Sequence, residues 1–189
     1  MATNNPFLDL RMRAGDVQRS VNWYQTQVRN LGRVQGSVTR MLSADTQHLT
    51  SNYQPGRLYL FKYDAKHKDT LPYWDAMPLV FPFRKVQGGF YGINLHYLPY
   101  GLRFALMGNL LDLAQGDENK RLLLSWQFLN KSSKFSGVNA CVKHYLHDHV
   151  QSNFLNIPQD QWLAASMMPI EQFQNADKST VFRHSRKNI

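Results

Sequence analysis

The chain has one cysteine, no long apolar run and no recognisable leader segment. Its single cysteine among 189 residues, Cys141, excludes an intrachain disulfide and fits synthesis in a reducing cytoplasm. The longest apolar stretch, residues 102–113, is interrupted by Arg103 and Gly108 and is shorter than the roughly 18 apolar residues of a membrane span. Residues 1–6 include no basic segment followed by an apolar run, so we expect no signal peptide and no membrane partner.

Motifs of the common enzyme classes are also missing. No Gly-x-x-x-x-Gly-Lys-Ser/Thr loop is present, and Gly88-Gly89 comes before an expected strand, which is typical of a turn and not of a phosphate-binding loop. No serine or cysteine lies in a recognisable nucleophile motif. We therefore expect a non-enzymatic protein without a cofactor.

Acidic residues are scarce, since 13 aspartates and glutamates oppose 22 lysines and arginines and leave a formal net charge of +9. This excess predicts an anionic neighbour, namely nucleic acid, a membrane surface or an acidic protein. The alternative is a basic surface that only improves solubility. Hydrophobic residues make up 43% of the chain, which is enough for a folded core.

Three regions differ in composition and predict the domain organisation. Residues 1–54 are expected to form an N-terminal arm, residues 55–175 an α+β core domain, and residues 176–189 a basic C-terminal tail. The arm contains an amphipathic helix that starts at Asp16, ends at Gly32 and has one apolar face. That face consists of Val17, Val21, Tyr24, Val28 and Leu31.

The core domain is predicted to combine short strands with helices. Strands are expected at residues 57–64, 78–83 and 90–97, and the prolines of the second favour a sheet edge. Helices are expected at residues 102–113 and 139–150, whereas residues 120–128 fit either type. The fold class is therefore α+β, with a small β-barrel or curled antiparallel sheet flanked by helices.

Two groups of residues resemble metal sites but fit simpler interpretations. Cys141, His144 and Asp148 would share one face of a helix and could ligate zinc, but their spacing matches no closed four-ligand pattern. Asp64 and Asp75 could serve a metal-dependent nuclease, but they lie around a lysine-rich loop without a second acidic cluster. We therefore expect no metal site.

Basic residues in the arm, the core and the tail are candidates for binding nucleic acid or a partner protein. Aromatic side chains lie between the basic residues of the core. They fit a hydrophobic core, stacking against nucleic-acid bases, or a protein interface. The candidate binding residues are Arg11, Arg13, Arg19, Arg29, Arg33, Arg40, Lys66, Lys68, Arg84, Lys85, Arg183, Arg186 and Lys187.

Much of the chain resembles a known family of virion proteins. The segments that carry the resemblance are Pro55-Gly56, residues 63–68, 71–75, 78–80, 88–99, 141–146 and 162–173. On these segments the chain is similar to virion structural proteins of T4-like contractile-tailed phages, some of which are described as DNA end protector proteins. The family offers no catalytic residues to carry over.

The resemblance implies a structural component of the virion that is made in the host cytoplasm. We expect it at the head–tail region, in contact with the end of the double-stranded phage DNA, because neutralising a DNA backbone needs mainly lysine and arginine. The alternative is a tail or baseplate protein that acts only through protein contacts. Other neck, tail or baseplate proteins are expected partners, and the chain is expected in multiple copies or as a connector subunit.

Overall fold

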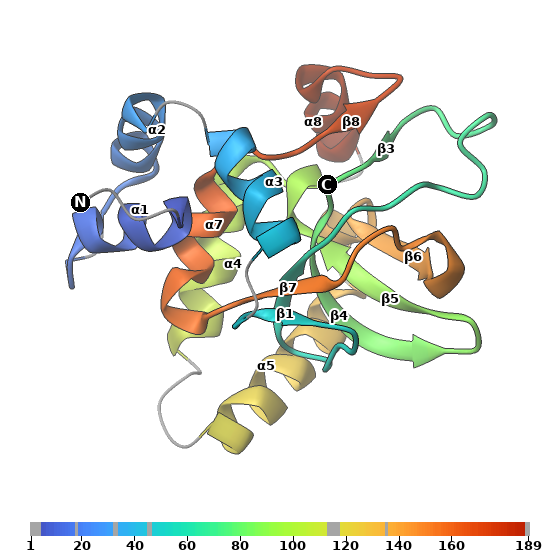
Figure 1. Ribbon diagram of the computed structural model, residues 1–189, viewed down its shortest axis with the longest axis horizontal. Helices are drawn as coiled ribbons and strands as arrows, with labels where there is room; N and C mark the ends of the chain where they lie inside the picture. Colours follow the sequence, from blue (N-terminus) through green and yellow to red (C-terminus); the bar gives the residue numbers. More distant parts are fainter. Residues whose placement is uncertain are drawn as a thin grey trace.

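The computed structural model describes residues 5–17, 19–31, 34–44, 47–112, 118–134 and 136–187. Its centre is an open six-stranded sheet in which all neighbouring strands are antiparallel (Figure 1). The α+β class is therefore confirmed, but β1 and β6 remain as sheet edges, and the predicted barrel is not confirmed. In spatial order the strands are β1 (Leu49–Thr50), β7 (Phe154–Ile157), β2 (Leu58–Leu60), β4 (Leu79–Val86), β5 (Gly89–Asn94) and β6 (Val142–Leu146).

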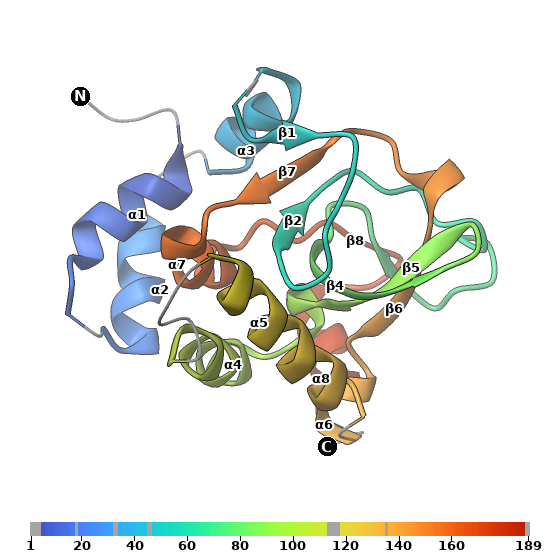
Figure 2. The ribbon, with the colours of Figure 1, turned by 90° about the horizontal axis from the view of Figure 1, so that it is seen from below.

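Helices pack against one face of this sheet, and there is a second sheet of two short strands (Figure 2). The second sheet pairs β3 (Trp74–Asp75) with β8 (Phe173–Gln174). The α-helices are α1 (Pro6–Ala14), α2 (Val21–Asn30), α3 (Val34–Ala44), α4 (Tyr100–Asp112), α5 (Glu118–Ser132), α6 (Ser136–Asn139), α7 (Trp162–Met167) and α8 (Lys178–Lys187). Short 3-10 helices are η1 (Leu95–Tyr97), η2 (His147–His149) and η3 (Gln159–Gln161).

The alternation of side chains along the strands divides the core in two. In β2, Leu58 and Leu60 join a large cluster with the helices, whereas Tyr59 lies on the opposite face. That opposite face carries an aromatic cluster of Tyr53, Tyr59, Phe61, Tyr63, Phe90, Tyr145 and Phe154. The helices therefore cover one face of the sheet, and aromatic rings fill the other.

The central strands differ from the prediction in their bounds and in the place of β4: β2 is shorter than the predicted 57–64, and β5 ends at Asn94, where the 3-10 helix η1 begins. Strand β4 lies between β2 and β5 and is not an edge strand; Pro82 is tolerated because β2 pairs only with residues 79 and 80. The pairing with β5 shifts between Pro82 and Arg84, and the carbonyl of the intervening Phe83 accepts a hydrogen bond from the Trp126 indole.

The helix predicted at residues 139–150 is wrong. Residues 142–146 form strand β6, which pairs with β5, and only residues 147–149 make a helical turn. The alternation of exposed His144 with buried Tyr145 has the period of a strand and not of a helix. The helix predicted at 102–113 is confirmed by α4, and the ambiguous segment 120–128 lies in helix α5.

The N-terminal helix is confirmed in part. Ser20, and not Asp16, caps α2 by accepting a hydrogen bond from the backbone N–H of Trp23, and Val17 is 62% exposed. Tyr24 and Val28 are buried as expected, whereas Gly32 lies outside the described residues. Side chains of α1, α2 and α3 belong to the same cluster as the sheet. The domain boundaries near residues 54 and 175 stay a prediction.

Candidate nucleic-acid interface

Several N-terminal arginines predicted to bind a partner already interact with other residues of the chain. Arg11 pairs with Asp16 at 3.0 Å, and Arg13 lies 3.7 Å from the Asp9 carboxylate. Arg19 donates to a backbone carbonyl and lies over the Trp23 ring. Arg29 and Arg40 are exposed, and Arg33 lies outside the described residues. The structure therefore does not gather these arginines into one cluster of unpaired charges.

The loop lysines and the C-terminal cations come from two different elements, the loop after β2 and helix α8. Lys68 pairs with Asp64 at 2.9 Å, and Lys66 is exposed. Arg183 and Arg186 are exposed on α8, where they line a shallow hollow with Phe182. Residues 178–187 form this helix, in which Val181 is buried. The backbone of Lys187 ends α8, but its side chain lies outside the described residues.

The hairpin of β4 and β5 brings cations and aromatic rings together on both faces of the sheet. Arg84 and Lys85 are exposed neighbours in β4, so their side chains point to opposite faces. In the described part of the chain neither forms an ion pair with an acidic residue. The hairpin therefore carries two positive charges that are available to an anionic partner.

On one face, Arg84, Tyr91 and His144 form a continuous stack across three strands. The three residues are directly opposite one another in the pairing of β4, β5 and β6. The guanidinium carbon of Arg84 lies 4.4 Å from the centre of the Tyr91 ring. The Tyr91 and His144 rings are 4.7 Å apart and inclined by 14°. Because His144 is exposed on edge strand β6, the stack ends in an open imidazole ring.

On the other face, Lys85, Tyr53 and His147 border a hollow of about 650 Å³. The Lys85 ammonium lies 5.4 Å from the centre of the Tyr53 ring, and the Tyr53 hydroxyl lies 3.5 Å from His147 Nε2. Serine and asparagine residues of segments 51–52 and 152–153 complete the wall. We call the two groups Arg84–Tyr91–His144 and Lys85–Tyr53–His147 together the hairpin end.

A comparison with protein families shows to which family the chain belongs. The family model described as phage T4 terminal DNA protecting protein matches residues 14–188. The chain belongs to this family. No curated protein and no solved structure matches the chain significantly.

Membership of the terminal DNA protecting protein family confirms the phage relationship that the sequence predicted. The family's description associates its members with phage DNA ends and names no enzyme class. Within the described residues of this family member, no helix is long and apolar enough to cross a membrane.

The zinc site considered from the sequence is not assembled in the structure. Residues 142–146 form a strand, so helical spacing does not bring Cys141 and His144 to one face. Cys141 is buried, and burial raises the pKa of its thiol to about 12, which disfavours a thiolate ligand. Among the described residues no group of three or more potential metal ligands is found. The absence of bound metal itself stays a prediction.

The sequence missed a buried polar network between the two sheets. The His96 Nδ1 atom lies 2.7 Å from the Asp75 carboxylate, and both side chains are at most 1% exposed. The side-chain NH2 group of Asn94 donates hydrogen bonds to the Asp75 carboxylate and to the Tyr145 hydroxyl. Backbone N–H groups of Met77 and Gln172 also donate to Asp75. The network joins β3, β5 and β6, so its role is to fix the sheets that support the hairpin end.

Arg103 is a buried cation that the sequence analysis identified only as a break in an apolar run. It is 0% exposed and donates to the backbone carbonyls of residues 96, 98 and 166. Its guanidinium lies over the Tyr100 and Phe182 rings, so it fixes α8 against α4. Lys178, at the start of α8, pairs with the buried carboxylate of Glu171. These contacts hold α8 on the fold.

The Asp75→Asn variant should lose part of the protein's acid sensitivity. Burial alone would raise the pKa of Asp75, but the charge and hydrogen bond of His96 and the two backbone N–H groups lower it. This carboxylate therefore stabilises the fold above the ordinary pKa of about 3.9, and the contribution is lost as the pH falls through the lower folded value. Denaturant unfolding at several pH values should show a shallower acid decline for the variant; equal slopes would contradict the assignment.

Proposed function

We propose that the chain is a non-enzymatic virion component of the head–tail region that binds the end of the phage DNA through the hairpin end. The observation that carries this proposal is the pair of cation–aromatic–histidine groups on the two faces of one hairpin. The family's description, which associates its members with DNA ends, supports it.

The stack of Arg84, Tyr91 and His144 suits a DNA end better than the interior of a duplex. Every base pair inside a duplex is stacked on both faces, whereas the terminal pair has one open face. The exposed His144 ring offers a flat surface that continues an existing stack. Stacking of a base on an aromatic ring contributes about 1–3 kcal/mol, so the stack should favour ends over interior sites.

The opposite group supplies contacts to phosphates. Lys85 is a point charge beside a hollow whose wall also contains the imidazole of His147 and several hydroxyl and amide groups. Such groups bind phosphate oxygens without reading the base sequence. Arg84 adds a second positive charge on the other face of the same hairpin. Lys85 and Arg84 could therefore contact the phosphates of the two DNA strands next to a terminal base pair.

DNA binding should be salt-sensitive, and its salt dependence should identify the cations involved. Each neutralised phosphate contributes a slope of about −0.9 in log K against log salt. Replacing Arg84 and Lys85 by alanine should reduce the slope by about two units, and replacing Arg183, Arg186 and Lys187 by up to about three, measured by fluorescence anisotropy with a short duplex.

The matched control replaces Arg13 and Lys68, which already pair with carboxylates, by alanine. This control should change the slope less than the hairpin variant, because its charges are already partly neutralised. If the wild-type protein shows no salt-sensitive DNA binding at low ionic strength, the proposal fails. The chain would then be a tail or baseplate protein that acts through protein contacts.

A further inference from the structure

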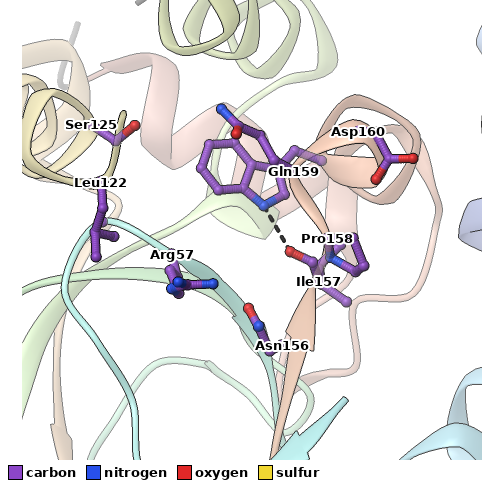
Figure 3. Close-up of a pocket in the computed structure, with 10 residues that line it drawn as sticks. Arg57, Leu122, Ser125, Asn156, Ile157, Pro158, Gln159 and Asp160 are labelled. Atoms are coloured by element: carbon purple, nitrogen blue, oxygen red, sulfur yellow. Dashed lines mark hydrogen bonds between the residues drawn. The ribbon is translucent and has the colours of Figure 1, made fainter. Parts of the chain in front are cut away.

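A pocket between α5 and the end of β7 lies apart from the hairpin end, none of whose side chains lines it (Figure 3). Its volume is about 410 Å³, within the range of roughly 300–1,000 Å³ that is typical of small-molecule sites. Figure 3 shows Ser125 on one side of the pocket, Asn156 and Asp160 on the opposite side, and Arg57 between them. The pocket therefore combines a cation, a carboxylate, an amide and a hydroxyl group.

Two polar groups of this pocket lack partners in the described part of the chain. Ser125 is 1% exposed, and its hydroxyl forms no hydrogen bond. The buried Nε2 amide of Gln159 also has no partner. Because nearly all buried polar groups in folded proteins are hydrogen-bonded, two such groups around one pocket indicate a ligand that supplies acceptor atoms.

The remaining walls are apolar and closely fitted. Gly56 has a φ of +90°, and a Cβ atom there would lie 2.8 Å from the Leu122 carbonyl oxygen. Only glycine lets this turn approach α5 so closely, and the turn brings Arg57 to the pocket. Trp162 lines the pocket, but its indole N–H already donates to the Ile157 carbonyl at 2.9 Å. Trp162 is only 4% exposed, so the indole contributes a small apolar patch to the pocket wall.

We propose that this pocket binds a single nucleotide. A nucleobase has apolar faces that fit Trp162 and an edge with both acceptors and donors. Its acceptors would satisfy Ser125 and Gln159, and its amino group would donate to Asp160. The phosphate would pair with Arg57. The nucleotide is either free or an unpaired residue of a DNA strand, since both present the same groups.

Calorimetric titration of the full-length protein tests this site with deoxyadenosine monophosphate, a short 5′-phosphorylated single strand and a blunt duplex. Ser125→Ala should weaken binding of the first two probes by about three- to tenfold, as expected for one lost hydrogen bond. It should not lower the melting temperature, because the hydroxyl has no partner in the fold. Tighter binding of the strand than of the mononucleotide assigns the pocket to unpaired DNA, and equal binding assigns it to free nucleotides.

Ser132→Ala is the matched control, because Ser132 is buried on the same helix, two turns further on, and does not line the pocket. It should leave the binding of every probe unchanged. The proposal is overturned if neither the mononucleotide nor the single strand binds, or if both serine variants weaken binding equally. Binding of the blunt duplex should be insensitive to Ser125→Ala, so that failure of the DNA-end function would be recognised separately.

Discussion

Replacing Arg103 by methionine is expected to lower the free energy of unfolding by about 3–5 kcal/mol, the range for breaking a buried charged interaction. Methionine preserves much of the side-chain volume but donates no hydrogen bond. The backbone carbonyls of residues 96, 98 and 166 would lose their donor, and buried Glu171 would lose a nearby positive charge. Urea denaturation monitored by circular dichroism measures the difference.

Arg29→Met provides the matched control, because Arg29 is exposed on α2 and surface substitutions change stability by about 0.5 kcal/mol or less. The Arg103 variant should also loosen α8, since Phe182 lies against the guanidinium. Faster hydrogen exchange of α8 amides would report this loosening. A loss of stability no larger than that of Arg29→Met would show that Arg103 does not fix the helix.

Replacing His144 by alanine is expected to weaken binding to DNA ends by roughly five- to 150-fold, the equivalent of about 1–3 kcal/mol of stacking. The imidazole is the exposed end of the Arg84–Tyr91–His144 stack, so its loss removes the flat surface that meets the terminal base pair. Binding to closed circular DNA should change much less, because circles offer no terminal pair. Competition binding with matched linear and circular DNA measures both effects.

His67→Ala is the control for this variant. His67 is exposed in the lysine-rich loop, and no ring contact is described for it. Its replacement should leave the preference for ends unchanged. If His144→Ala weakens linear and circular DNA equally, the ring contributes to general binding and does not read the end.

The sequence predicted the elements whose periodicity is strong. Helix α4 and the buried face of α2 follow from their apolar spacing, and β5 follows from its aromatic residues after a Gly-Gly turn. Strand β6 was assigned as a helix, on which Cys141, His144 and Asp148 would share one face, because so short a segment fits both periods. The pairing of this segment with β5 makes it a strand and not a helix, and the local sequence does not reveal that pairing.

The sequence predicted the cations of the candidate site and aromatic residues between them, but not which ring lies against which cation. Arg84 and Lys85 were identified from their charge, but their aromatic partners Tyr91 and Tyr53 come from other segments of the chain. A direct cross-strand pairing of β5 with β6 brings His144 onto Tyr91, and this depends on the register of the sheet. The Asp75–His96 pair was missed for the same reason, because Asp75 was considered only as a possible nuclease carboxylate. The net charge of the chain does not show which cations form ion pairs, so the pairing of Arg11, Arg13 and Lys68 with nearby aspartates was not predicted.

The most direct test of the proposed function compares a linear duplex with a covalently closed circle of the same sequence and length. Each is used to compete with a labelled linear duplex for the wild-type protein at fixed salt. We predict that the linear form competes at least several-fold better, and that cutting the circle once restores full competition, because only a cut circle has a terminal base pair to stack on His144. Equal competition by the closed and the cut circle would contradict end recognition.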